Sequence, residues 1–253
     1  MQVEIAIPVL NEERTLKTNV ETVLGALKNL FEAPECIALV IADNGSTDRT
    51  QAIGEQLAQD NASVRYRRVP KPGVGTALKD AWLSSMADIV GYMDLDLATD
   101  LKHLPEAIKA IEVGGYDVCY GSRLHANSNV IGRKKSREFI SHAFNIVLKL
   151  YVGATFSDGM CGFKFIRRSL LERIIARGAT SDGWFFSTEL LLSAERLGLR
   201  VKELPVRWTD DPDSRVRLVP LTLQYLRAMS VLRSRDKVVA YDAAQTLKFD
   251  GPK

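Results

Sequence analysis

Val3-Glu4-Ile5-Ala6-Ile7-Pro8-Val9, near the start of the chain, is a run in which all but one side chain is apolar. A similar run, Ile37-Ala38-Leu39-Val40-Ile41-Ala42, follows a segment from Leu16 to Leu30 whose apolar residues recur at helical spacing. Apolar runs rich in Val and Ile are typical of strands buried on both faces of a parallel sheet. The order strand, helix, strand therefore predicts a βαβ unit.

The same alternation continues along the chain and decides the fold class. Alternating strands and helices predict an α/β protein with a Rossmann-like, mostly parallel sheet flanked by helices. Ser46 or Thr47 is expected to cap the helix that follows the second strand. Further strands are predicted over 64–69, 89–93, 118–120 and 201–208, and further helices over 46–59, 75–87, 101–113, 133–151, 169–176 and 187–197.

The pattern divides the chain into two parts. Residues 1–210 carry the strands and helices, and residues 211–253 read as a linker, an amphipathic helix and a polar tail. The apolar stripe of that helix consists of Leu221, Tyr225, Met229 and Leu232. Basic residues lie beside the stripe, so residues 220–235 suit either an anionic membrane surface or a protein surface. The sequence leaves both alternatives open.

The composition excludes several classes of protein. The chain has 253 residues, of which 46% are hydrophobic and 26% charged, so it is long and apolar enough to bury a core. Three cysteines and three histidines without metal-ligand spacing argue against a disulfide framework and a zinc site. No apolar run is long enough to span a bilayer and the N-terminus reads as a strand, so we expect a cytoplasmic protein, or one peripheral to the cytoplasmic face of the membrane.

Two aspartates follow the strand predicted over 89–93, in the motif Asp94-Leu95-Asp96. Ligands of α/β sheets bind at the carboxyl ends of the strands. Because side chains alternate along a strand, Asp94 and Asp96 are expected to project to the same side. Two carboxylates this close repel each other unless a divalent cation neutralises them, and hard oxygen ligands suit Mg²⁺ or Mn²⁺. A second motif of this kind, Asp211 to Asp213, lies in the linker and reads as a solvated turn.

The remaining motifs stand in a definite order: Ile7-Pro8-Val9-Leu10-Asn11-Glu12, Ala42-Asp43-Asn44-Gly45-Ser46-Thr47-Asp48, Lys71-Pro72-Gly73-Val74-Gly75, Gly121-Ser122-Arg123, Asp158-Gly159-Met160-Cys161-Gly162-Phe163-Lys164, and Trp184 to Glu189. Together with the aspartate motif, this order resembles family 2 glycosyltransferases with the GT-A fold over residues 3–217. The later motifs are similar to dolichyl-phosphate mannose synthases and polyprenyl-phosphate glycosyltransferases. The resemblance implies inverting transfer of a hexose from a nucleotide-sugar, of the GDP-mannose or UDP-glucose type, to a polyprenyl or dolichyl phosphate.

The resemblance places the nucleotide near the first two predicted strands. It implies that Pro8, Leu10 and Glu12 line the nucleotide site, and that Asp43 or Asn44 contacts the base or the ribose. A carboxylate that accepts two donors from a base edge or a ribose diol fits this role. The chain departs from the family pattern at two positions, with Leu10 where an aromatic residue is usual and Asn44 where a second Asp is usual. The identity of the donor is therefore left open.

The resemblance also assigns residues to the metal and to the acceptor. Asp94 and Asp96 would hold a metal ion that offsets the charge building on the nucleoside diphosphate as it leaves. Arg123, Arg133 and Arg137 would bind the phosphate of the acceptor, because guanidinium groups match phosphate oxygens. The chemistry expected at this edge of the sheet is therefore transfer of a sugar between two phosphorylated ligands.

Two further residues complete the site that the resemblance implies. Arg215 resembles a late basic residue that closes over the diphosphate. Asp158 is the candidate acid or base beside the acceptor. A phosphate acceptor is already largely ionised at neutral pH, so a strong base is unnecessary, and Asp158 alternatively orients the sugar or an arginine. Both roles of Asp158 stay open from the sequence.

Two other functions remain as alternatives. One is a family 2 glycosyltransferase with a soluble small-molecule acceptor, because the sequence has no membrane-spanning run. The other is a non-catalytic nucleotide-binding module, against which the joint presence of Asp94, Asp96, Arg123 and Asp158 argues. The basic clusters lack interleaved aromatic residues that would stack on bases, so no nucleic-acid partner is expected. The oligomeric state is not predicted.

Overall fold

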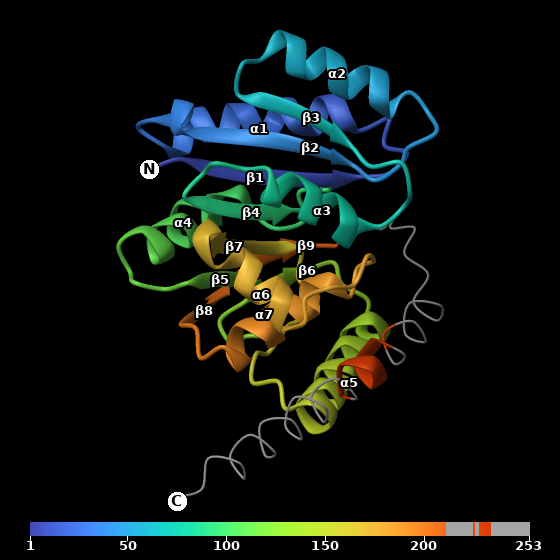
Figure 1. The fold of residues 1–253 in the computed structure, drawn as a ribbon, viewed down its shortest axis with the longest axis vertical. Helices are drawn as coiled ribbons and strands as arrows, with labels where there is room; N and C mark the ends of the chain where they lie inside the picture. Colours follow the sequence, from blue (N-terminus) through green and yellow to red (C-terminus); the bar gives the residue numbers. More distant parts are fainter. Residues whose placement is uncertain (211–224, 226–227, 234–253) are drawn as a thin grey trace, which may run out of the picture.

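A seven-stranded mixed sheet forms the centre of the protein, in the order β3-β2-β1-β4-β7-β5-β8 (Figure 1). The computed structural model describes residues 1–210, Tyr225 and residues 228–233, without the side chains of Ser136 and Arg137. Its strands are β1 (Val3–Val9), β2 (Ile37–Asp43), β3 (Val64–Arg68), β4 (Ile89–Met93), β5 (Val118–Ser122), β6 (Asn129–Ile131), β7 (Phe163–Arg167), β8 (Val201–Pro205) and β9 (Arg207–Thr209). Strands β6 and β9 pair with each other, in parallel, outside the main sheet.

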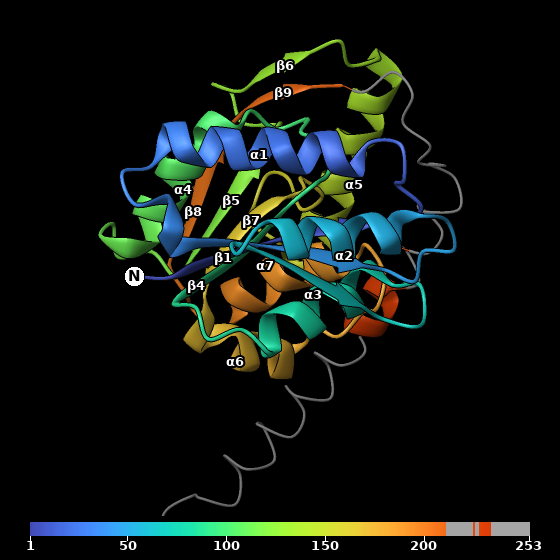
Figure 2. The same ribbon diagram turned by 90° about the horizontal axis from the view of Figure 1, so that it is seen from above.

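Helices cover both faces of this sheet (Figure 2). One face is covered by α1, α2 and α4, and the other by α3, α6 and α7. The helices are α1 (Leu16–Leu30), α2 (Thr50–Asp60), α3 (Val74–Leu83), α4 (Leu104–Glu112), α5 (Lys135–Val152), α6 (Leu171–Arg177) and α7 (Phe186–Arg196), with single 3₁₀ turns at η1 (Pro34–Cys36), η2 (Leu101–His103) and η3 (Arg168–Leu170). The predicted α/β class, with helices flanking a largely parallel sheet, is confirmed.

The pairing of β1 brings the polar ends of three strands together. Strand β1 is parallel to β2 on one side and to β4 on the other. After β1 the chain first forms β2 and β3 on one side of this strand. It then crosses over and forms β4 on the other side. This reversal creates a topological switch point, which is where open α/β sheets bind ligands. The residues that follow β1, β2 and β4 consequently meet at one edge of the sheet.

The prediction missed β7, which lies antiparallel between β4 and β5. This segment, Phe163 to Arg167, has an apolar pattern interrupted by Lys164, which is nevertheless fully buried. A lysine is rarely buried unless it is paired, so the segment did not read as a central strand. The strand predicted over 201–208 is also divided, because the chain passes from β8 in the main sheet to β9 in the small one.

The predicted helix cap at Ser46 or Thr47 is wrong, because α2 begins at Thr50. Ser46 and Thr47 instead join the ends of two strands. The Ser46 Oγ accepts a hydrogen bond from the Asn11 amide at 3.0 Å, and the Thr47 amide donates to the Asn11 Oδ1 at 2.8 Å. Tertiary contacts between the loops after β1 and β2 therefore use the groups that would have capped the helix.

The apolar stripe of the C-terminal segment packs on the protein itself. Tyr225, Met229 and Leu232 are buried in the same core cluster as the helices on one face of the sheet. The Tyr225 ring lies 5.2 Å from the rings of both Phe144 and Phe185. For these three residues the protein-packing alternative holds. Leu221 and the predicted linker lie outside the described residues, and no helix within the described part is long and apolar enough to cross a bilayer.

His103 predicts a pH dependence of stability. Its Nε2 accepts the Arg207 amide of β9 at 2.8 Å, which requires a neutral acceptor nitrogen. Burial lowers the pKa of His103 below its ordinary value. The unfolded chain therefore binds a proton first, so this stabilisation is complete above about pH 6.5 and is lost as the pH falls through the lower folded pKa.

Thermal unfolding between pH 7.5 and pH 5 measures this effect. His103→Gln keeps an acceptor that does not titrate, so the fall in melting temperature at low pH should be smaller than in the wild type. His142→Gln, at an exposed histidine of α5, is the control and should behave as the wild type does. A His103→Gln profile parallel to that of the wild type would contradict the assignment.

Candidate active site

Two side chains at the carboxyl end of β2 connect the segments at the edge of the sheet where the nucleotide was expected. Asp43 is fully buried and accepts hydrogen bonds from the Ser46 amide, at 2.7 Å, and from the Tyr66 hydroxyl. The next residue, Asn44, accepts from the Gly73 amide through its side-chain oxygen. Asp43 and Asn44 therefore connect the end of β2 to strand β3 and to the loops that follow β2 and β3.

The residues expected after β1 lie at the same edge, with different accessibility. Pro8 is buried within β1, whereas the Leu10 side chain is 41% exposed. Glu12 is half-buried, and its carboxylate accepts the Thr15 hydroxyl at 2.8 Å. Leu10 is therefore the apolar surface available to a ligand here. Arg68, at the end of β3, was not predicted, and it donates to the Ser46 carbonyl at 3.0 Å.

Asp94 and Asp96 are brought together, although not by strand alternation. Strand β4 ends at Met93, so both aspartates lie in a turn, which closes with Leu97 in the left-handed region at φ 54°. Asp96 is exposed, and its Oδ1 accepts the Ala98 amide at 3.0 Å. The Oδ1 of Asp94 is buried and accepts no hydrogen bond from the described residues. Burial, and then the nearby charge of Asp96, raise the pKa of Asp94 to about 7.

This arrangement fits a divalent cation. A buried carboxylate oxygen without a hydrogen-bond partner is costly, and burial and the charge of Asp96 raise the pKa of Asp94 although Arg123 and Lys164 act in the opposite direction. Two hard oxygen ligands on one turn suit Mg²⁺ or Mn²⁺. Within the part of the chain that is described, no cluster of three or more metal-ligating side chains occurs. A cation held by Asp94 and Asp96 would therefore complete its shell with water and substrate phosphate, as Mg²⁺ commonly does.

Arg123 and Asp158 form a buried ion pair at the end of β5. Two Arg123 nitrogens donate to the Asp158 carboxylate at 2.7 and 2.9 Å, and the Arg123 amide donates at 3.1 Å. Burial alone would raise the pKa of Asp158, but the charge and hydrogen bonds of Arg123 lower it to about 2. Asp158 is thus held ionised, and its contacts are with Arg123 and its own loop.

Arg133 lies close to this pair and forms no ion pair of its own with a described residue, although the charges of Asp158, Asp210 and Glu138 act on it. Its Nη2 donates to the Ser141 hydroxyl of α5 at 2.6 Å, but its Nε and Nη1 are buried without a hydrogen-bond partner among the described residues. Burial, and then the charge of Arg123, lower the pKa of Arg133. A guanidinium group that has two nitrogen donors without a described partner, and that lies beside a second guanidinium group, is suited to binding a phosphate group. Of the other arginines expected here, Arg137 belongs to α5 without a described side chain, and Arg215 lies outside the described residues.

Lys164 of β7 is a site residue to which sequence reasoning assigned no role. Its Nζ is fully buried and donates to the Cys161 carbonyl and the Ser187 hydroxyl, both at 2.6 Å, and to the Gly159 carbonyl at 3.2 Å. Burial lowers the pKa of Lys164 to about 8. The ammonium group thus binds two backbone carbonyls of the loop between Asp158 and β7 at the same time. The sequence signal for it was a lysine inside an otherwise apolar strand.

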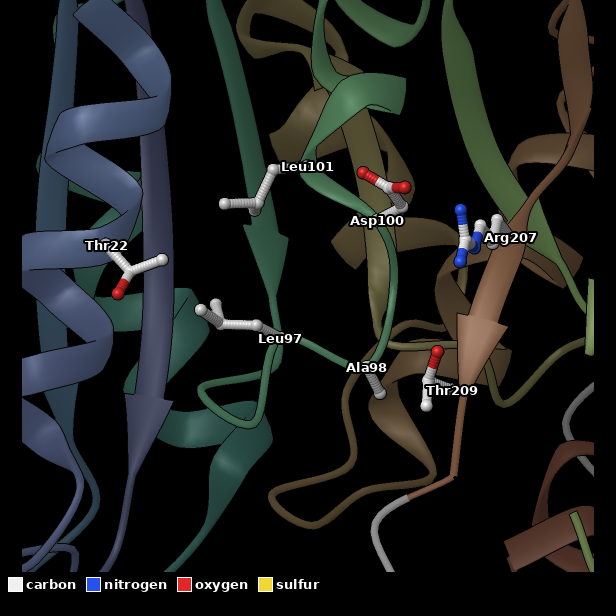
Figure 3. Close-up of a pocket in the computed structure, with 7 residues that line it drawn as sticks. All are labelled: Thr22, Leu97, Ala98, Asp100, Leu101, Arg207 and Thr209. Atoms are coloured by element: carbon white, nitrogen blue, oxygen red, sulfur yellow. The ribbon is translucent and has the colours of Figure 1, made fainter. Parts of the chain in front are cut away.

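An open pocket lies beside the turn of the two aspartates (Figure 3). It separates α1 from β9, and the segment that follows β4 forms its floor. Its lining residues are Thr22, Leu97, Ala98, Asp100, Leu101, Arg207 and Thr209. None of the residues predicted for the nucleotide, metal or acceptor lines it. The candidate site is therefore defined by the charged groups at the ends of β4 and β5, and this pocket lies next to it.

The sheet order, the switch point and the carboxylate pair after β4 agree with the GT-A fold that the sequence motifs led us to expect. The sequence comparison specifies the class further. Residues 4–175 match the sequence profile of the family described as "Glycosyl transferase family 2". The chain belongs to this family and is a glycosyltransferase. The family expected from the sequence motifs is thereby confirmed.

Several named proteins are similar to this chain. "Glycosyltransferase AglD" from Haloferax volcanii is 34% identical over 221 residues, which cover 87% of this chain and 35% of that protein. "Dolichyl-phosphate beta-glucosyltransferase" from Drosophila melanogaster is 26% identical over 259 residues, covering 98% of this chain and 79% of that protein. A solved structure of glucosyl-3-phosphoglycerate synthase from Mycobacterium tuberculosis, with Mn²⁺, UDP and glucosyl-3-phosphoglycerate, has a TM-score of 0.65 at 20% identity, over 92% of this chain and 79% of that one. The structural likeness concerns the fold.

Gly162 provides a test of the carboxylate pair that does not alter either carboxylate. A Cβ at this position would overlap the carboxylate of Asp94, so Gly162→Ala must displace that group. A displacement of about 1 Å at a reacting centre can lower turnover about 100-fold. We expect turnover and Mn²⁺ affinity to fall together, measured by steady-state kinetics and by titration of the metal.

Gly25→Ala is the matched control for this substitution. Gly25 lies exposed in α1, and no atom lies within 4 Å of the place that an alanine methyl group would take, so turnover and metal affinity should be unchanged. Alanine also has the higher helix propensity, so the control should be no less stable than the wild type. Wild-type metal affinity in Gly162→Ala would refute the role of Asp94 in holding the cation.

Proposed function

We propose that the chain transfers a hexose from a nucleotide-sugar to a polyprenyl phosphate, with Mg²⁺ or Mn²⁺ as cofactor. The observation that carries this proposal is Arg133, whose buried Nε and Nη1 are unused by the described residues, beside Arg123 at the edge that also holds Asp94 and Asp96. One phosphate-binding group and one cation-binding group at a single edge suit two phosphorylated substrates. The similarity to dolichyl-phosphate glucosyltransferases supports the lipid acceptor, and UDP-glucose in a structural neighbour supports a donor of that type.

Each substrate has its own set of residues. Asp94 and Asp96 would hold the cation, which supplies positive charge to the departing diphosphate. Arg133 and Arg123 would bind and orient the acceptor phosphate, whose oxygen is already ionised at neutral pH. No strong base is then required, and Asp158, with its pKa near 2, acts by holding Arg123 in place. The donor nucleotide would be lined by Pro8, Leu10, Glu12, Asp43 and Asn44.

Helix α5 supports an acceptor that is embedded in a lipid surface. Its inner face contributes Ser141 to Arg133, while its outer face is apolar and exposed. Six of the fourteen exposed large apolar side chains of the described structure lie on this helix: Phe139, Ile140, Ile146, Val147, Leu150 and Tyr151. Exposed lysines lie at both of its ends, at Lys134, Lys135 and Lys149. An apolar face between basic residues suits an anionic membrane surface.

We therefore propose that the protein is peripheral to a membrane and that α5 makes the contact. The alternative of a membrane contact through the stripe within residues 220–235 is weakened, because Tyr225, Met229 and Leu232 are buried against the protein. The polyprenyl chain would leave the phosphate site along the apolar face that begins at Phe139. A soluble phosphorylated acceptor is the competing function, since a structural neighbour binds phosphoglyceric acid.

Release of nucleoside diphosphate measures the reaction directly. UDP-glucose and GDP-mannose are assayed with polyprenyl phosphate in vesicles and with soluble phosphate monoesters, each with Mn²⁺ and with EDTA. We expect turnover with the lipid acceptor that is lost in EDTA. Arg133→Ala removes a charge-assisted hydrogen bond and should raise the acceptor KM about 10- to 100-fold, with little change in the donor KM.

Arg173→Ala, at an exposed arginine of α6, is the control and should leave both KM values unchanged. Faster turnover with a soluble phosphate monoester would select the competing function. An equal rise of donor and acceptor KM in Arg133→Ala would contradict the acceptor role of this residue.

Vesicle flotation tests the membrane contact separately. Phe139 and Leu150 are 74% and 83% exposed, so Phe139→Glu together with Leu150→Glu should abolish salt-sensitive binding to anionic vesicles without unfolding the protein. Met86→Glu, at a side chain 95% exposed elsewhere on the surface, is the control and should bind as the wild type does. Binding that survives the double substitution would exclude α5 as the contact.

A further inference from the structure

Two guanidinium groups of the candidate site share one aromatic ring. The central carbons of Arg123 and Arg133 lie 5.4 and 5.5 Å from the ring centre of Trp208. Both distances are within the range of cation–π attraction, which is strongest for tryptophan. The sequence motifs did not indicate Trp208, because it stands at the end of the single strand predicted over 201–208. The structure thus adds a third residue to the two arginines.

The backbone around Trp208 is tied on both sides. On one side, β9 joins the segment that follows the two aspartates, with the Thr209 amide donating to Ala98 at 2.8 Å and the Asp100 amide donating to Arg207 at 3.0 Å. On the other side, β9 pairs with β6, where Trp208 is opposite Val130. Strand β6 ends shortly before Arg133. Trp208 is therefore anchored between the aspartate turn and the second arginine.

The direction of the Trp208 side chain follows from strand geometry. Arg207 and Thr209 line the pocket of Figure 3. Because neighbouring side chains on a strand point to opposite faces, Trp208 points away from that pocket and toward Arg123 and Arg133. The ring therefore packs against the phosphate-binding side of β9, while the pocket lies on the other side.

The charges around Arg133 explain why an aromatic ring suits this position better than a carboxylate would. Arg123 is neutralised by Asp158, but its charge still lowers the pKa of Arg133. A carboxylate in contact with Arg133 would neutralise it and compete with an incoming phosphate. An aromatic face attracts the guanidinium without occupying its N–H donors, which leaves Nε and Nη1 of Arg133 unused by the described residues. A neutral aromatic partner thus holds the cation and preserves its affinity for an anion.

We propose that Trp208 is a positioning residue that holds Arg123 and Arg133 side by side for the phosphate group of the acceptor. The inference rests on the proposed function only in naming the acceptor, since any phosphate monoester presents the same chemistry to two guanidinium groups. Because β9 also pairs with the segment after Asp96, Trp208 further sets the distance between the phosphate-binding arginines and the carboxylates that would hold the cation.

Substitutions at Trp208 separate the aromatic role from simple packing. Trp208→Leu keeps an apolar side chain but removes the aromatic face, and should raise the acceptor KM about tenfold while kcat and the donor KM change less than threefold. Trp208→Phe restores an aromatic face and should recover most of the loss. Tyr116→Leu is the matched control, because that ring also lies near two cations, Arg200 and Lys202, at 5.1 and 5.8 Å, at the opposite end of β5.

Fluorescence with inorganic phosphate as the probe gives a readout that does not depend on sugar transfer. Phosphate bound by the two arginines should change the emission of Trp208. We expect a saturable change in the wild type and in Tyr116→Leu that is absent in Trp208→Phe. This change in a protein that fails to glycosylate polyprenyl phosphate would support the inference and refute the proposed acceptor.

Two results would overturn the inference. One is an unchanged acceptor KM in Trp208→Leu. The other is a loss in Trp208→Leu that is equal for donor and acceptor and is not recovered by Trp208→Phe, since that outcome describes a packing defect. An emission change on adding phosphate that persists in Trp208→Phe would likewise place the bound phosphate away from this ring.

Discussion

The buried ion pair between Arg123 and Asp158 is the interaction on which the site depends. Neither charge is stable in a protein interior without the other, and removing one partner of such a pair leaves an uncompensated charge. The pair joins the end of β5 to the loop that leads into β7. That loop ends at Gly162, whose backbone lies directly against Asp94. One ion pair thereby relates Arg123 to the carboxylates of the turn after β4.

The polar cluster at this edge contains one carboxylate and one guanidinium group with unsatisfied atoms. The carboxylate suits the proposed cation, and the guanidinium group suits the proposed acceptor phosphate. Among the described residues, the buried Oδ1 of Asp94 accepts no hydrogen bond, and the buried Nε and Nη1 of Arg133 donate none. These unsatisfied groups lie on different segments, Asp94 in the turn after β4 and Arg133 in the segment between β6 and α5. Strand β9 connects these two regions through its backbone pairs. The proposal of separate sites for a metal-bound diphosphate and for an acceptor phosphate rests on this division.

Most of the fold could be predicted because it depends on local patterns. The apolar runs of β1, β2 and β4 and the periodicity of α1 specify buried strands and an amphipathic helix without tertiary information. Lys164 prevented the prediction of β7 as a central strand, because a lysine is not expected inside a sheet. Its burial is possible because carbonyls of the preceding loop accept its hydrogen bonds, and this loop takes its position only in the folded protein. The aspartate pair could be predicted from its position after β4, but Trp208 and Ser141 could not, because only the tertiary structure brings them to Arg133.

The antiparallel position of β7 has a consequence for the order in which the chain assembles. Strands β4 and β5 both complete their hydrogen bonding through β7, which is synthesised after them. Until residue 167 has left the ribosome, β4 is an open sheet edge, and an open apolar edge invites pairing with other chains. The half of the sheet that contains β1 to β4 is therefore made first with one edge unpaired, and β7 is the strand that covers this edge.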